Sequence, residues 1–210
     1  MRSQDSSGSF YPEPSRPVRL AGIVGIAGAL LWPITLIALA NALGGCSGGS
    51  CPLDRGSLLV MALSPVCLGL AALGLELRVP RSPGFGDLVG DLTIGTSAAL
   101  FAAAVVTGIA GLVGPGLLLL LIGSLIFGIA GYVNGARQRL ASAFVAIGAG
   151  SVLIVVVAGA GAAGSGLETP GLLGLLLFSI GWGWLGGHLA LGRPLPIPEP
   201  RRGGRPGRRA

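Results

Sequence analysis

The sequence predicts an all-α fold: a polytopic membrane bundle of six transmembrane helices with both termini in the cytoplasm. Charged residues make up only 10% of the 210 residues, against about a quarter in soluble domains. Uncharged apolar runs follow one another along the chain, and nearly all basic residues fall on one side of them. A soluble helical domain is excluded because no expected helix carries a polar stripe that would face water.

Five runs lack any charged residue and are each longer than the roughly 18 residues that indicate a membrane span. They cover 20–53, 56–75, 92–136, 140–167 and 169–192. The third run is more than twice the length that a bilayer requires, and Gly114, Pro115 and Gly116 lie at its middle, so it predicts two helices joined by a tight turn. The expected helices are 19–43, 57–77, 92–113, 117–134, 140–163 and 171–192.

The first two helices each contain a proline near the middle, Pro33 and Pro65. Proline removes one backbone hydrogen bond, so a kink is expected in both. The third helix is mildly polar at its start, and its Thr93, Thr96 and Ser97 are expected to bond their own backbone or a neighbouring helix. Asp87 and Asp91 are expected to precede this helix, where the helix dipole favours a carboxylate.

The arginines predict the orientation, since loops that flank membrane helices concentrate basic residues in the cytoplasm. All 14 basic residues are arginines. With the N-terminus inside, the outer side carries only Arg55. The cytoplasmic side carries Arg2, Arg16, Arg19, Arg78, Arg81, Arg137, Arg139, Arg193, Arg201, Arg202, Arg205, Arg208 and Arg209. The expected location is the inner membrane of a bacterium, with the chain crossing it several times.

The chain divides into residues 1–17, an expected disordered cytoplasmic tail, residues 18–192, the transmembrane domain, and residues 193–210, a cytoplasmic tail rich in proline and arginine. The last tail either contacts anionic lipid or acts only as a topology signal. The candidate lipid contacts are Arg201, Arg202, Arg205, Arg208 and Arg209. Nothing specific in the sequence indicates nucleic acid as a partner.

The 39 glycines suit helix packing in lipid, where small residues let backbones approach closely. Candidate packing positions are the pairs Gly131 and Gly135, and Gly183 and Gly187, with a similar spacing at Ala146 and Gly150. Gly22, Gly25 and Gly28 leave one face of the first helix without bulky side chains, which we call its lean face. These faces predict packing within the bundle, or alternatively association with a second copy.

Cys46 and Cys51 lie in the first outer loop and are expected to form a structural disulfide, because that loop would face an oxidising compartment. Alternatives are a redox-active pair and lipidation of Cys46 after cleavage of the first span. Cys67 is expected to act as a small apolar residue, and His188 as an interfacial residue without a special role.

No catalytic residue, metal site or cofactor is predicted, because the chain has no phosphate loop, no HExxH, no GxSxG and no acid pair at catalytic spacing. We therefore expect a non-enzymatic accessory or assembly partner that interacts with the lipid bilayer and with other membrane proteins or itself. One alternative is a small-molecule permease or substrate-capture subunit, its cavity lined by the first three helices. Another is a thiol oxidoreductase using Cys46 and Cys51.

Overall fold

The computed structural model describes residues 15–44, 55–78, 85–134, 139–159 and 168–192. In this part of the chain the secondary structure is helical throughout, and six helices are long and apolar enough to cross a membrane. The elements are α1 (Arg16–Gly44), α2 (Arg55–Arg78), α3 (Phe85–Thr107), the 3₁₀ turn η1 (Ala110–Leu112), α4 (Val113–Asn134), α5 (Arg139–Gly159) and α6 (Glu168–Leu191). The predicted all-α class and the six spans are confirmed.

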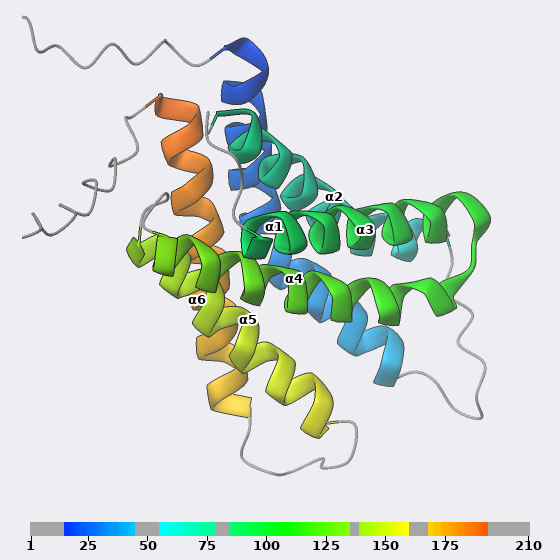
Figure 1. Cartoon of the computed structure of the whole chain (residues 1–210). Coiled ribbons are helices and arrows are strands. Elements are labelled where there is room, and N and C mark those ends of the chain that lie inside the picture. The colour runs from blue at the N-terminus through cyan, green and yellow to red at the C-terminus, as the bar shows by residue number, and fades with distance from the viewer. Residues whose placement is uncertain (1–14, 45–54, 79–84, 135–138, 160–167, 193–210) are drawn as a thin grey trace, which may run out of the picture.

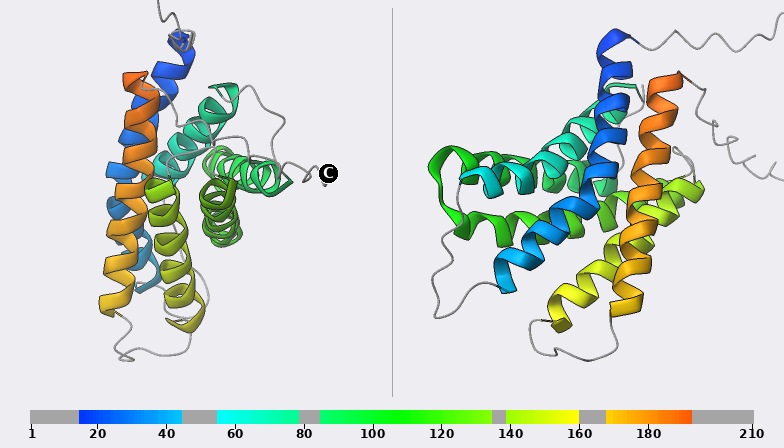
Figure 2. Two further views of the ribbon diagram at one scale, coloured as in Figure 1. Left: turned by 60° about the vertical axis from the view of Figure 1, so that its left-hand side comes forward. Right: turned by 180° about the vertical axis from the view of Figure 1, so that it is seen from behind.

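The six helices form a closed ring in chain order. Each helix packs against the one before it and the one after it, and α1 packs against α6 to close the ring. Helices α1, α5 and α6 run roughly alongside one another, whereas the α3–α4 hairpin crosses them steeply (Figures 1 and 2). The ring brings residues from the two ends of the chain into one interior.

The turn between α3 and α4 lies earlier than predicted. Gly108 ends α3 with φ +73°, and its N–H donates to the Ala104 carbonyl at 2.8 Å, which is the usual left-handed helix cap. Pro115 instead lies in the first turn of α4, where a missing N–H costs no helical hydrogen bond. The prediction of a turn at Gly114–Gly116 was therefore wrong.

Helix α3 also begins earlier than predicted, at Phe85. Asp87 lies in its first turn and Asp91 one turn later, so the expectation that both precede the helix was wrong. The sequence pattern missed this start because two carboxylates interrupt the apolar run there. The first turn of a helix nevertheless accommodates an acid well, because the positive end of the helix dipole stabilises it.

Both proline-containing helices continue through their prolines. Helix α1 changes direction partway along its length (Figure 2). Pro65 lies next to Ser64, whose hydroxyl donates to the Gly28 carbonyl on α1 at 2.7 Å. That bond crosses the α1–α2 contact and is buried, so it helps hold the first two helices together.

The helices pack mainly through close approach of their backbones at glycine. On α1, a Cβ added to Gly22 would collide with the Ala190 backbone, one on Gly25 would lie 2.7 Å from the Ala71 Cβ, and one on Gly28 would lie 2.8 Å from the Cys67 Cβ. These three positions face α6 and α2, so the lean face predicted for the first helix is confirmed.

The α5 helix is approached just as closely from both sides. A Cβ on Gly128 of α4 would lie 2.7 Å from the Ala146 nitrogen, and one on Gly181 of α6 would lie 2.7 Å from the Val145 nitrogen. Gly148 of α5 faces the Phe178 backbone of α6. Larger side chains at these positions would separate the helices, because their contacts are with backbone atoms that cannot move independently.

Candidate functional site

The most distinctive interior feature is a cluster of four aromatic side chains, which we name the central aromatic cluster: Trp32, Phe127, Phe178 and Trp182. All four have 0% exposure. The ring centroids of Trp32 and Phe178 are 5.0 Å apart, those of Phe178 and Trp182 are 6.4 Å apart, and those of Trp182 and Phe127 are 5.2 Å apart. The cluster therefore connects α1, α6 and α4 across the ring.

Two members of this cluster, and several hydroxyls on the helices that form it or pack against it, have polar atoms without a hydrogen-bond partner. Within the described part of the chain, they include the indole nitrogens of two of its members and four hydroxyl oxygens, all buried. They are Trp32 Nε1, Trp182 Nε1, Thr35 Oγ1, Ser124 Oγ, Ser142 Oγ and Ser179 Oγ. Burying such a group without a partner costs free energy, and native interiors contain few of them.

The helix positions place these groups near the cluster. Thr35 lies one turn from Trp32 on α1, Ser124 one turn from Phe127 on α4, and Ser179 one turn from Trp182 on α6. Ser142 belongs to α5, and its carbonyl oxygen would lie 2.7 Å from a Cβ on Gly128 of α4. The unpartnered groups thus come from α1, α4, α5 and α6, one side of the ring.

Other hydroxyls of the bundle, both buried and exposed, have partners. Ser64 donates to Gly28 O across α1 and α2, and Ser97 of α3 donates to Gly116 O of α4 at 2.7 Å. Thr93 and Thr96 donate to carbonyls of their own helix, Val89 O and Leu92 O. Both expectations for the polar side of the third helix are therefore met, the first by the threonines and the second by Ser97.

The chemistry available at the central aromatic cluster is hydrogen bonding and flat apolar contact. Its members include no carboxylate, imidazole or thiol, which general acid–base or nucleophilic catalysis would use. In the described residues, no group of three or more His, Cys, Asp or Glu side chains could hold a metal ion. The sequence predicted no role for Trp32 or Trp182. A tryptophan deep in an apolar helix was the available signal, since a buried indole N–H usually has a partner.

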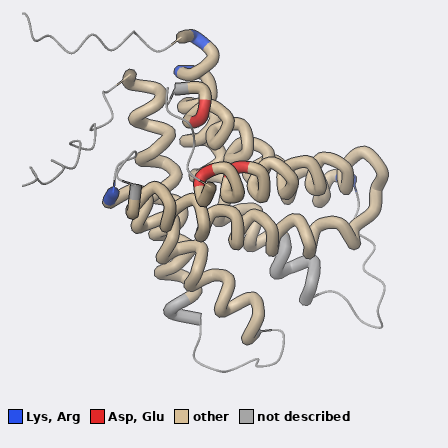
Figure 3. Tube along the Cα trace, viewed as in Figure 1, with Lys and Arg blue, Asp and Glu red and all other residues tan. Residues whose placement is uncertain are grey.

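Charged side chains gather at one end of the ring. Arg16 begins α1 and Arg139 begins α5, and both helix ends lie on the same side as the carboxyl ends of α2, α4 and α6 (Figure 1). Figure 3 shows acidic residues at the end of α2 and the start of α3. Arg55 begins α2 at the opposite side. We name the first side the arginine end.

The residues predicted from sequence are scattered. Gly131 is buried, Gly183 would bring a Cβ to 3.8 Å from the Ala29 Cβ, and a Cβ on Gly187 would meet nothing within 4 Å. Cys67 is half-buried on α2 and is a free thiol. Several predicted residues lie outside the described residues: Gly135, Cys46, Cys51, Arg201, Arg202, Arg205, Arg208 and Arg209.

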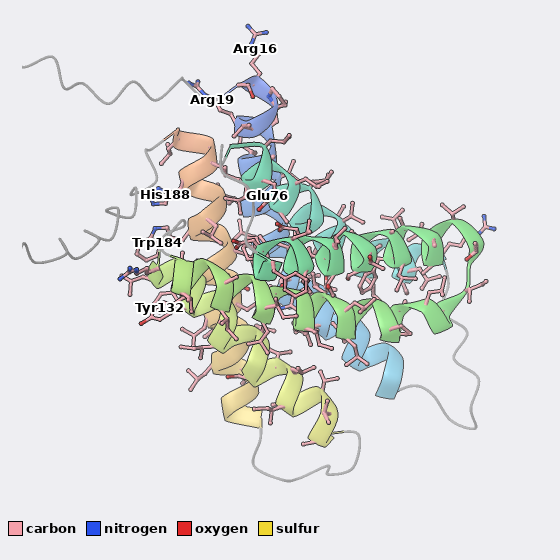
Figure 4. The ribbon with its side chains drawn as sticks, in the orientation of Figure 1. Arg16, Arg19, Glu76, Tyr132, Trp184 and His188 are labelled. Atoms are coloured by element: carbon pink, nitrogen blue, oxygen red, sulfur yellow. The ribbon has the colours of Figure 1, made fainter. Side chains whose placement is uncertain are left out.

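His188 and Trp184 lie on the outward side of α6 (Figure 4). Trp184 is 41% exposed and makes an edge-to-face contact with Phe144 of α5, with ring centroids 6.4 Å apart. The two tryptophans of α6 thus divide their roles: Trp182 fills the interior and Trp184 faces the surroundings.

Comparisons of the chain with protein-family models, curated proteins and solved structures find no match.

Proposed function

We propose that this chain is a non-enzymatic integral protein of the bacterial cytoplasmic membrane, with both termini inside, that acts as an accessory or assembly partner of other membrane proteins. The proposed orientation follows from the arginines, thirteen of which it places on the cytoplasmic side and one, Arg55, outside. The arginine end of the ring is then the cytoplasmic end.

The observation that carries the accessory role is the mostly apolar interior of the ring. The four rings of the central aromatic cluster are fully buried and span from α1 to α4. A permeation path would need a row of polar groups that reach solvent, and the described interior consists mostly of apolar side chains. The outer surface is apolar as well, with exposed leucine, isoleucine or valine on every helix, which suits contact with lipid and with other membrane helices.

The experiment for this role is affinity purification in a mild detergent from the native host after crosslinking, with mass spectrometry of bound proteins. A defined membrane protein recovered at constant stoichiometry supports the proposal. The matched control is the α6 variant Gly181→Leu, expressed at the same level, because a residue that separates α5 from α6 should abolish the association. Purification of the intact chain alone, with no protein at constant stoichiometry, would overturn the accessory role.

The orientation has its own test, in which reporters active only inside or only outside are fused to the C-terminus. We expect activity only from the inside reporter.

We further propose that Cys46 and Cys51 form a disulfide in a segment that faces the outside. In intact cells, a membrane-impermeant thiol reagent should label this pair only after reduction, whereas labelling without reduction would contradict the disulfide.

A second function, capture of a small molecule, is favoured by the unpartnered groups around the central aromatic cluster. Indole N–H groups and hydroxyls beside flat rings are the means by which a protein holds a planar polar compound. If this role is correct, a compound should be released on denaturing the purified protein, and Trp182→Phe should reduce its recovery because the ring remains but the N–H is lost. An unchanged recovery in Trp182→Phe would contradict this role.

A further inference from the structure

One outward face at the arginine end differs from the rest of the apolar surface. It contains Tyr132 of α4, Arg139 of α5, and Trp184 and His188 of α6, and we name it the basic aromatic face. Tyr132 is 54% exposed, Arg139 is exposed and Trp184 is 41% exposed. Figure 4 shows Tyr132, Trp184 and His188 along the same outer edge of the ring, pointing away from the interior.

Two close helix contacts bring these residues to one level. Gly128 approaches the Ser142 carbonyl oxygen, with 2.7 Å to an added Cβ, and Tyr132 follows Gly128 by about one turn. Gly181 approaches the Val145 nitrogen and the Ala141 carbonyl oxygen, and Trp184 follows Gly181 by less than one turn. On both helices, the residues that follow the glycine lie closer to the start of α5, where Arg139 lies.

The contacts around Trp184 hold its ring in place at this level. Its edge-to-face contact with Phe144 joins α6 to α5, and the same outward side of α6 carries Gly187, where an added Cβ would meet nothing within 4 Å. The backbone at Gly187 is thus open to a neighbouring molecule. An aromatic ring that packs on Phe144 and lies beside exposed backbone gives a ligand an apolar surface with a polar edge.

The positive charge of Arg139 favours an anion as the ligand of this face. Arg139 lies in the first turn of α5, where the helix dipole disfavours a cation, and that turn contains no acid. The arginine is therefore not placed there for helix stability. The acidic residues of this end lie at the end of α2 and the start of α3 (Figure 3), and the first turn of α5 contains none.

We propose that the basic aromatic face binds the headgroup of an anionic phospholipid. Arg139 pairs with the lipid phosphate, as a guanidinium does through parallel hydrogen bonds. Trp184 and Tyr132 occupy the depth at which amphipathic rings meet the headgroup region. The acyl chains then lie along the exposed apolar side chains of α4 and α6. This inference depends on membrane insertion and not on the accessory role, so either can fail without the other.

The experiment measures lipid-dependent stabilisation of the purified full-length protein. Thermal unfolding is followed in mixed micelles of detergent with phosphatidylglycerol or with phosphatidylcholine. A ligand that binds only the folded state raises the melting temperature, so phosphatidylglycerol should stabilise the protein more than phosphatidylcholine does. High salt should reduce the difference because it screens the charge pairing.

Matched variants locate the site. Arg139→Gln should weaken the apparent affinity for phosphatidylglycerol about tenfold, the loss expected for one charge-assisted contact, and Arg139→Lys should retain part of it. Arg55→Gln removes the same charge at the opposite end and should leave the affinity unchanged. Trp184→Phe, which keeps a ring against Phe144 and removes the N–H, should weaken the affinity by about twofold to threefold.

Three outcomes would overturn the proposal. The first is an equal effect of Arg139→Gln and Arg55→Gln, which would indicate a general charge effect. The second is equal stabilisation by phosphatidylcholine. The third is equal stabilisation by inorganic phosphate at matched ionic strength, which would assign the site to a free anion and not to a lipid. Circular dichroism of each variant in detergent checks that the helices are retained.

Discussion

The α5–α6 contact and the outer turn of the α3–α4 hairpin are both rich in glycine, but glycine acts differently in each. At the α5–α6 contact, Gly148 and Gly174 face backbone atoms of the opposite helix. At the hairpin turn, Gly108, Gly111 and Gly114 would each bring an added Cβ to open space (Figure 1). Identical residues therefore allow close packing in one region and a change of chain direction in the other.

This difference teaches that glycine content alone does not identify a helix interface in a membrane protein. In the first region the missing side chain matters because of what lies across the contact. In the second, only the backbone conformation of Gly108 matters, since its φ of +73° is one that other residues rarely adopt. Matched glycine-to-alanine substitutions separate the two effects.

The largest effect is expected for Gly148→Ala. The new Cβ would collide with the Phe178 backbone and lie 2.7 Å from the Gly174 carbonyl oxygen, so we expect a loss of about 1–3 kcal/mol in the free energy of unfolding. The control is Gly187→Ala on α6, where the Cβ meets nothing within 4 Å and stability should be unchanged or slightly higher. Equilibrium unfolding in mixed micelles measures both, and equal losses would contradict the packing role of Gly148.

A smaller loss, about 1–2 kcal/mol, is expected for Gly108→Ala, because an alanine is strained at a positive φ. The matched control is Gly111→Ala in the same turn, which has the same open surroundings and an ordinary φ, and we expect no loss. The same unfolding assay applies. A loss at Gly111 as large as that at Gly108 would show that space around the turn, and not backbone conformation, decides the outcome.

The smallest effect is expected for Ser97→Ala. Its hydroxyl donates to Gly116 O on α4, and such bonds between membrane helices contribute on average about 0.6 kcal/mol. Thr96→Ala is the control, because the Thr96 hydroxyl donates within its own helix, to Leu92 O. Ser97→Ala should lower stability by about 0.5–1 kcal/mol and Thr96→Ala by less. The reverse order would contradict a structural role for the bond between α3 and α4.

The sequence predicted which stretches become helices better than where they begin and end. Long uncharged runs have one stable form in lipid, since a helix satisfies its own backbone hydrogen bonds. Their ends are set by local caps. Gly108 ended α3 although the more conspicuous turn signal was Gly114–Gly116, and the acids Asp87 and Asp91 lay inside α3 although they interrupted the apolar run.

The central aromatic cluster and the basic aromatic face could not be predicted in this way. Trp32 and Trp182 are 150 residues apart in the numbering, and Trp32 of α1 joins Phe178 and Trp182 of α6 because α1 packs against α6. Likewise, Tyr132, Arg139 and Trp184 come to one level only through the close contacts at Gly128 and Gly181. Nothing in the periodicity of a uniformly apolar helix indicates which side faces a neighbour.

The amino-acid sequence by itself thus determined that the chain consists of membrane-spanning helices, because hydrophobic length and the cost of burying unpaired backbone groups in lipid depend on composition alone. Beyond the face of Gly22, Gly25 and Gly28, tertiary structure alone decided which glycines are contacts, which tryptophans are buried and which polar groups lie in the interior. The physical reason is that helix association in lipid depends on the fit between surfaces, and that fit exists only once two helices are placed against each other.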